Sequence, residues 1–136
     1  MAYLLDTTTA SYVMDGNEAV ARRLRSTLDS ESVYTSVITE GELLAGALRM
    51  GRSRRQEILE EVNLLLADLT DVIPVTRGVA SSYAQLRRDL EGRGRTIGVS
   101  DLWIAAIALA NELTLVAHDK DFQRVEGLAL EDWLQS

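Results

Sequence analysis

The amino-acid sequence predicts an α/β protein: a three-layer α/β/α sandwich around a central parallel sheet of four to five strands. The short apolar run at residues 3–5 stops abruptly at the carboxylate of Asp6, which is typical of a strand buried on both faces. Strand-like runs then alternate with segments of helical periodicity, as they do in parallel sheets. The segment 101–112 is apolar around nearly its whole circumference, which indicates a helix buried against the sheet.

Two periodicities define the elements of the first half of the chain. Apolar residues three and four positions apart predict amphipathic helices, and β-branched or aromatic runs bounded by polar residues predict strands. Gly16 marks a turn and Gly51 a break between two helices. The predicted elements are a strand ending at Leu5, a helix to about Met14, a helix over 18–28, a strand over 32–36, a helix opening at Thr39 and a long helix over about 53–69.

The second half continues the alternation. Pro74 lies in the third predicted strand and favours an edge position or a strand end, because proline cannot donate to the hydrogen-bond ladder. The basic, glycine-containing stretch 91–95 predicts a flexible loop, and Ser100 is expected to cap the buried helix. The predicted elements are a strand over 71–75, a helix over 77–91, the buried helix over 101–112, a strand over 114–117, a turn or single helical turn over 118–122 and a last strand over 127–130.

The composition is that of one globular domain over residues 1–136, with 46% hydrophobic and 26% charged residues. There is no cysteine, which excludes a disulfide framework and a thiolate zinc site. No apolar run approaches a membrane span and the N-terminus lacks an export signal, so we expect a cytoplasmic protein without a membrane partner. The net charge of −7 argues against sequence-independent adhesion to nucleic acid, although the arginines are clustered.

Acidic residues from four segments are predicted to meet at one edge of the sheet. Asp6 ends the first strand, and Asp119 follows the fourth strand closely, with Asp121 two residues further on. The carboxyl ends of parallel strands form the crevice in which open α/β proteins bind ligands. Glu42, near the start of a helix, and Asp101, which opens the buried helix, are held at the same edge.

Each of these acids also has a simpler structural explanation. Asp6 is placed to cap a helix, and Glu42 has the spacing of a capping box with the threonine three residues earlier. An acid such as Asp101 in a first helical turn is favoured by the helix dipole. Asp119 and Asp121 have the character of turn residues. Taken together, these simpler explanations become weaker. Capping residues occur at the start of any helix, so capping does not explain why all of these acids are expected at the same crevice.

Clustered carboxylates without histidine or cysteine are hard oxygen ligands that suit Mg²⁺ or Mn²⁺. Without a cation they would repel one another and raise the pKa of at least one acid. Two such ions about 3.5–4 Å apart could activate water and stabilise the leaving oxygen of a phosphodiester. Gly46, one turn after Glu42, leaves room beside that carboxylate, whereas His118 is more typical of a surface residue than of a catalyst.

Four stretches carry a recognisable pattern in order along nearly the whole chain. They are Leu4-Leu5-Asp6-Thr7, the run from Ser36 to Gly46, the pattern Gly98-x-x-Asp101-x-x-Ile104-Ala105-Ala106 and the run from Leu115 to Phe122. In these stretches the sequence resembles the PIN-domain ribonucleases, and within these the VapC-type toxins of prokaryotic toxin–antitoxin pairs. Thr8 stands where that family usually has asparagine.

The resemblance implies that Asp6, Glu42, Asp101 and Asp119 form an acidic metal site, with Asp121 as a candidate fifth ligand. It also implies cleavage of RNA with Mg²⁺ or Mn²⁺, homodimerisation, and neutralisation by a small VapB-like antitoxin. An antitoxin arginine entering the acidic pocket is a reasonable hypothesis, because a guanidinium pairs with carboxylates in bidentate fashion. The alternative is a catalytically inactive PIN-like module for binding or regulation, whose acids only cap helices.

Overall fold

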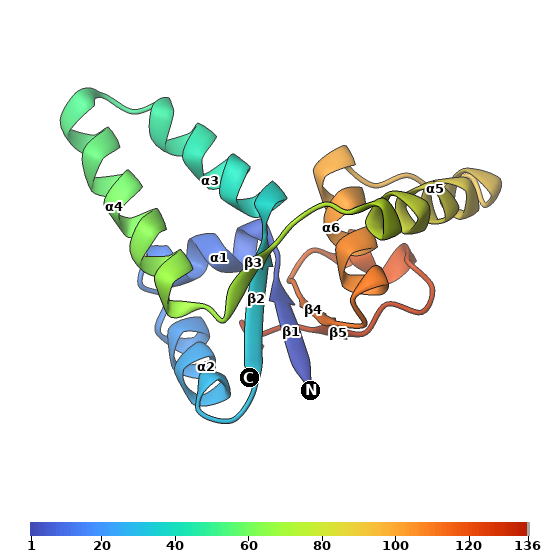
Figure 1. Ribbon diagram of the computed structural model, residues 1–136, viewed down its shortest axis with the longest axis horizontal. Helices are drawn as coiled ribbons and strands as arrows, with labels where there is room; N and C mark the ends of the chain where they lie inside the picture. Colours follow the sequence, from blue (N-terminus) through green and yellow to red (C-terminus); the bar gives the residue numbers. More distant parts are fainter. Residues whose placement is uncertain (136) are drawn as a thin grey trace.

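The computed structural model describes residues 1–135, and a five-stranded sheet forms its centre (Figure 1). Every neighbouring pair of strands in this sheet is parallel. The α/β fold class predicted from the sequence is therefore confirmed. The strands are β1 (Ala2–Leu5), β2 (Ser32–Ser36), β3 (Asp71–Ile73), β4 (Thr114–Val116) and β5 (Leu130–Glu131), and their order in the sheet is β3-β2-β1-β4-β5.

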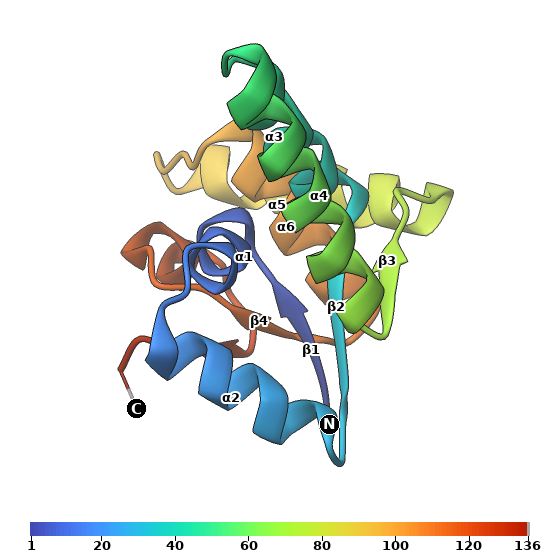
Figure 2. The same cartoon turned by 90° about the vertical axis from the view of Figure 1, so that its left-hand side faces the viewer.

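Helices cover both faces of the sheet, which gives the three predicted layers. Four of them lie on one face and the other two on the opposite face (Figures 1 and 2). Within residues 1–135, none of the helices combines the length and the apolar character that crossing a bilayer requires. The first face carries α1 (Thr7–Met14), α2 (Glu18–Leu28), α3 (Val37–Leu48) and α4 (Arg52–Asp68), the second carries α5 (Arg77–Gly92) and α6 (Val99–Ala110), and a 3₁₀ helix, η1 (Lys120–Arg124), follows β4.

Side chains of the central strands fill a core on each face of the sheet. Leu4 of β1 packs with residues of α5 and α6, whereas Tyr3 and Leu5 pack with residues of α1, α2 and α4. Leu115 and Val116 of β4 divide between the two cores in the same way. Because both faces of these strands are buried, the strands consist of continuous apolar runs rather than alternating patterns.

The strand order places a topological switch point between β1 and β4. From β1 the chain proceeds outward to β2 and β3 on one side, while β4 and β5 occupy the other side. The backbone N–H of Asp6, just after β1, donates to the carbonyl oxygen of Val116 at the end of β4, at 3.1 Å. The two strand ends are thus neighbours, as predicted, and ligands of open α/β sheets bind at such a point.

The edge strand β3 is shorter than predicted and ends at Ile73. Pro74 follows directly and has no N–H to continue the ladder. The proline therefore lies both on an edge of the sheet and at a strand end, and the sequence prediction of one or the other is confirmed.

Helix α3 begins two residues earlier than predicted. Ser36 is its N-cap, and the Ser36 Oγ accepts a hydrogen bond from the backbone N–H of Thr39 at 3.1 Å. Thr39 is therefore inside the first turn, and the predicted capping box of Thr39 with Glu42 is wrong. This correction removes the simpler structural explanation for the Glu42 carboxylate.

The ends of α6 and β5 also differ from the prediction. Gly98 is the N-cap of α6, which has no side-chain cap, so Ser100 lies within the helix instead of capping it. The helix ends before Glu112, whose φ of 53° is left-handed. The positive φ of Gly127 belongs to a turn, and the last strand, β5, begins after that turn.

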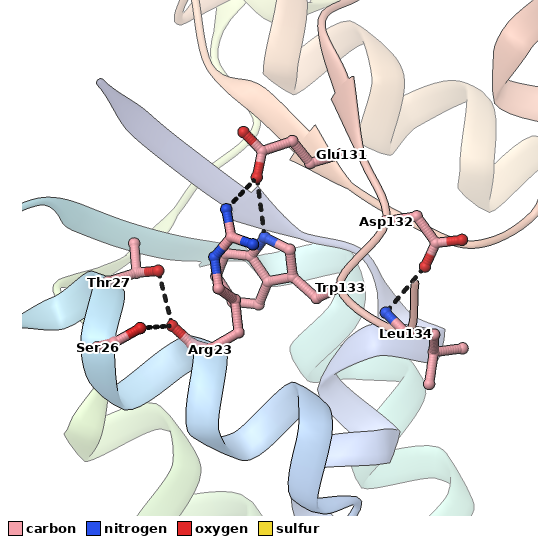
Figure 3. Close-up of polar contacts among 7 residues, drawn as sticks. All are labelled: Arg23, Ser26, Thr27, Glu131, Asp132, Trp133 and Leu134. Atoms are coloured by element: carbon pink, nitrogen blue, oxygen red, sulfur yellow. Dashed lines mark hydrogen bonds and ion pairs between the residues drawn. The ribbon is translucent and has the colours of Figure 1, made fainter. Parts of the chain in front are cut away.

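The residues after β5 pack back onto β1 and α2, a feature that the sequence analysis did not predict. The Trp133 side chain is buried, and its ring centroid lies 5.7 Å from that of Tyr3. Its indole Nε1 donates to Glu131 Oε1 at 3.1 Å, and Arg23 Nη2 donates to the same oxygen at 3.0 Å (Figure 3). This C-terminal clamp (Arg23, Glu131 and Trp133) attaches the end of the chain to the body of the protein.

Candidate active site

Asp6 is a buried carboxylate at the junction of β1 and α1, with only 2% of its surface exposed. It is the N-cap of α1, and its Oδ1 accepts the backbone N–H of Thr9 at 2.8 Å. Burial raises the pKa of Asp6 to about 6; the hydrogen bond from the Thr9 backbone N–H opposes this shift, and repulsion from Asp101 and Asp119 adds to it. Capping a helix and belonging to an acidic site are therefore not exclusive explanations for Asp6.

Asp101 is half-buried in the first turn of α6, where the charges of the other acids affect its carboxyl group. Burial raises the pKa of its carboxyl above the usual range, and the negative charges of Asp119, Glu42 and Asp121 raise it further. The contribution from the neighbouring acids arises because like charges that lie close together repel one another. The structure thus brings the predicted acids into one electrostatic environment at the carboxyl edge of the sheet.

Two threonine hydroxyls hold the Glu42 carboxylate in place. Thr7 Oγ1 donates to Glu42 Oε1 at 2.6 Å and lies 3.1 Å from Thr39 Oγ1. A hydroxyl has a single proton, so Thr39 donates to Thr7 while Thr7 donates to the carboxylate. This relay joins α1 to α3 beside the crevice. The sequence predicted a capping role for Thr39 and no role for Thr7, whose one available signal was that it directly follows Asp6.

The two acids after β4 have different surroundings. Asp119 is the N-cap of η1, where its Oδ1 accepts the backbone N–H of Asp121 at 2.9 Å. The Asp121 carboxylate lies 3.3 Å from the Arg124 guanidinium. The charge of Asp119 raises the pKa of both Asp6 and Asp101, whereas Asp121 raises that of Asp101. The charge of Asp119 therefore affects two of the other acids, whereas the charge of Asp121 affects one.

The acids are neighbours without forming a closed cage. Among residues 1–135, no three aspartate, glutamate, histidine or cysteine side chains are already arranged to hold a metal ion. Asp6 and Asp101 instead have raised pKa values, to which repulsion from the other acids contributes. The arrangement is that of a negatively charged crevice at the switch point of the sheet.

Comparison with known proteins identifies the family. The PIN domain family matches residues 3–128. The chain belongs to the PIN-domain family.

Ribonuclease VapC1 of Haemophilus influenzae is 32% identical over 135 residues, which cover 98% of each chain. Ribonuclease VapC5 of Mycobacterium tuberculosis is 35% identical over 133 residues, which cover 92% of this chain and 95% of that protein. Within the PIN domains, the chain therefore belongs with the VapC ribonucleases, as its sequence motifs indicated.

Solved structures of VapBC proteins have the same fold as this PIN domain. VapBC2 from Rickettsia felis, bound to a DNA fragment from its promoter, gives a TM-score of 0.91 at 28% identity, over 98% of this chain and 99% of that chain. VapBC-1 from nontypeable Haemophilus influenzae gives 0.88 at 31% identity, over 99% and 100% of the two chains. VapBC-5 from Mycobacterium tuberculosis, a member of the VapBC family of toxin–antitoxin systems, gives 0.72 at 30% identity, over 96% of each chain.

Membership of the PIN nucleases implies a divalent metal requirement, and the donor set of this PIN domain fits one. The crevice offers carboxylate oxygens, which are the ligands that hard divalent cations prefer. Burial is the main cause of the raised pKa values of Asp6 and Asp101, and repulsion from the neighbouring acids adds to it. A divalent ion would relieve this repulsion.

His118 lies next to Asp119 in the sequence, yet its hydrogen-bond partner belongs to another segment. Its Nδ1 lies 2.7 Å from Asp132 Oδ2, and about half of its side chain is exposed. The expectation of a surface histidine agrees with this position. In the PIN domain it links the segment after β4 to the segment after β5.

A hollow beside Glu42 lies between α1, α3 and α4, and Gly46 lines it. A Cβ added at Gly46 would meet no atom within 4 Å. The glycine is therefore not required by close approach of a second helix. The room beside the Glu42 carboxylate that the sequence predicted is present.

We expect Gly46→Ala to raise the free energy of unfolding by about 1 kcal/mol, because alanine costs less backbone entropy than glycine within a helix. Urea denaturation with an unchanged m-value would measure the gain. Gly41→Ala in the same helix is the matched control, since a Cβ there also meets no atom within 4 Å, and a similar gain is expected. A loss of stability at Gly46 alone would contradict the open space beside it.

Proposed function

We propose that this PIN domain is a metal-dependent endoribonuclease acting as the toxin of a type II toxin–antitoxin pair, which hydrolyses RNA phosphodiester bonds at its acidic crevice. The observation that supports this most directly is the coupling of buried and half-buried carboxylates at the switch point between β1 and β4. Helix capping alone does not require carboxylates that repel one another. A site that binds a divalent cation does, because the cation offsets that repulsion.

The residues that would hold the ion are Asp6, Glu42, Asp101 and Asp119, with Asp121 as a fifth candidate. Mg²⁺ or Mn²⁺ bound there supplies Lewis acidity toward the scissile phosphate and a water nucleophile. The protein contributes orientation. Thr9 fixes one oxygen of Asp6, and Thr7 fixes one oxygen of Glu42, so each carboxylate retains a second oxygen for other contacts.

Partners follow from the same proposal. Relatives of known structure are VapBC proteins, so we infer that a VapB-like antitoxin neutralises this chain in the cytoplasm and that the chain forms a homodimer. An antitoxin arginine that enters the crevice would pair with the acids in bidentate fashion. Asp101→Ala would then weaken antitoxin binding, and unchanged binding would contradict the arginine contact.

The deciding experiment is cleavage of a panel of cellular RNAs by the purified chain in Mg²⁺, with Mn²⁺ in parallel. We expect discrete cleavage products that disappear on addition of EDTA and in the Asp6→Asn variant. Cleavage that persists in EDTA would contradict metal dependence. If folded protein cleaves no RNA in the panel with either ion, the alternative of a PIN-like binding or regulatory module is favoured.

Thr7→Val is expected to lower the cleavage rate about 10- to 100-fold, the range observed when a group that orients a metal ligand is lost. Valine keeps the size of the side chain but removes the hydroxyl that donates to Glu42. Thr8→Val, one position along on an exposed side chain, is the control and should retain the wild-type rate. Equal rates for Thr7→Val and wild type would show that the relay does not support the site.

A further inference from the structure

A second hollow runs from Glu42 along one face of α3 toward the C-terminal end of that helix. It begins at the acidic crevice, because α3 and α6 both start at the carboxyl edge of the sheet (Figure 1). Small side chains in its lining leave it open, and a Cβ added at Gly41 would meet no atom within 4 Å. Its lining includes Gly41, Glu42 and Ala45 of α3 and Arg49 at the C-cap of that helix, together with Thr7 of α1 and Ser100 of α6.

Arg49 is the one cationic residue that lines this hollow. It is exposed, and within residues 1–135 its guanidinium takes part in no hydrogen bond or ion pair. Two nearby arginines of α4 already have partners. Arg54 pairs with Glu57 at 2.9 Å, and Arg55 donates to the carbonyl oxygens of Leu48 and Met50. The Arg49 guanidinium is therefore available for a ligand.

Arg49 and Glu42 lie on the same face of α3, because seven residues are close to two full turns of a helix. Their separation along the helix axis is about 10 Å at 1.5 Å per residue. The hollow between them thus runs from an acid of the proposed catalytic site to the Arg49 guanidinium, which has no partner within residues 1–135. A linear ligand entering the crevice along α3 would meet both.

The charge distribution indicates what kind of ligand this is. The crevice is negative, and the chain as a whole carries a net charge of −7, so a polyanionic strand is repelled except where cations are provided. A divalent ion held by the acids would compensate the charge of the phosphate that reacts, but it would leave the flanking phosphates uncompensated. A guanidinium has the planar donor geometry that binds phosphate oxygens in bidentate fashion.

We propose that Arg49 binds a phosphate of the RNA strand flanking the scissile one, and that the hollow along α3 seats the strand between the two. This inference rests on the proposed function and extends it, since it names a substrate-binding residue outside the acidic site and the helix face along which the strand lies. An acidic segment of a protein partner could meet the same guanidinium, but continuity with the crevice favours the strand that must enter it.

The test compares Arg49→Ala and Arg49→Gln with Arg52→Ala. Arg52 is also exposed, lies at the start of α4 and does not line the hollow, so its loss removes the same charge from the same end of the α3–α4 pair. We expect both Arg49 variants to raise KM about 10-fold at an unchanged kcat, and Arg52→Ala to leave both constants unchanged. Unaltered thermal unfolding of the variants would show that the change is not a folding defect.

A binding measurement in EDTA separates this inference from the cleavage activity. Fluorescence anisotropy with a short, fluorescein-labelled, single-stranded oligoribonucleotide is expected to show about 10-fold weaker binding for the Arg49 variants. The slope of log affinity against log salt should become shallower by about 0.7, the value for one phosphate contact on a single strand. Weaker binding by the Arg49 variants supports the inference even if the wild type cleaves no RNA, an outcome that would overturn the proposed activity alone.

Three outcomes would overturn the inference. The first is wild-type RNA cleavage and binding by the Arg49 variants, which would leave the proposed nuclease activity intact. The second is an equal loss of affinity in Arg49→Ala and Arg52→Ala, which would indicate a diffuse electrostatic effect. The third is weakened binding of a protein partner by the Arg49 variants with unchanged RNA binding, which would assign the guanidinium to that partner.

Discussion

Asp6→Asn is expected to abolish RNA cleavage and, at the same time, to stabilise the metal-free protein at about pH 7.5. Asparagine is as good an N-cap as aspartate, so the hydrogen bond from Thr9 to this position is kept. What the variant loses is a buried negative charge that burial and the neighbouring acids disfavour. Loss of that charge removes a ligand of the proposed metal site, for which we expect a rate decrease of about 100-fold or more.

The size and sign of the stability change follow from the pKa of Asp6. It is about 6 in the folded protein against an ordinary value of 3.8. The folded state therefore binds more protons than the unfolded state between these pH values, and the wild-type free energy of unfolding falls as the pH rises from about 4 to about 7. At about 1.4 kcal/mol for each pH unit, the full effect is about 3 kcal/mol. Asparagine does not ionise, so its advantage is complete above about pH 7 and absent near pH 4.

Chemical denaturation in EDTA at about pH 4 and about pH 7.5 would measure this difference. Asp6→Ala is the control, because it removes the same charge together with the cap and should be about 1 kcal/mol less stable than Asp6→Asn. Added Mg²⁺ should stabilise the wild type and leave Asp6→Asn unchanged, since a ligand that binds only the folded state raises its stability. An Asp6→Asn variant less stable than wild type at neutral pH would show that the charge is not disfavoured by burial.

The position of the acidic site could be predicted from the sequence because it depends on strands that are buried on both faces. Such strands are continuous apolar runs, and a carboxylate that ends one is conspicuous, as Asp6 is after β1. The pairing of β1 with β4 then placed Asp119 at the same edge. These are properties of the parallel architecture as a whole and need no knowledge of side-chain contacts.

The contacts that orient the site could not be predicted in this way. Ser36 and Thr39 are both good N-cap residues, and the choice between them depends on how far β2 extends alongside β3. With Ser36 as the cap, Thr39 is free to donate to Thr7 and support Glu42. Threonine has many local uses in turns and caps, so its sequence position alone does not indicate such a role.

The C-terminal clamp is a second feature that local pattern does not predict, and its loss should be severe. We expect Trp133→Ala to lower the free energy of unfolding by about 3–5 kcal/mol, because the side chain is buried against Tyr3 and its removal leaves a cavity. That is a large part of the roughly 5–15 kcal/mol by which most domains are stable. Thermal and urea unfolding would measure the loss, and a change below about 1 kcal/mol would contradict the packing described for this residue.

Trp133→Phe separates the packing of the ring from its hydrogen bond. Phenylalanine keeps most of the apolar contact but lacks the indole N–H that donates to Glu131, so the expected loss is nearer 1–2 kcal/mol. The clamp also bears on the acidic site. The backbone carbonyl of Glu131 accepts the N–H of Ala117, two residues before Asp119. Loosening of β5 in Trp133→Ala should therefore disturb Asp119 and reduce cleavage even under conditions in which the variant is folded, whereas Trp133→Phe should retain most of the activity.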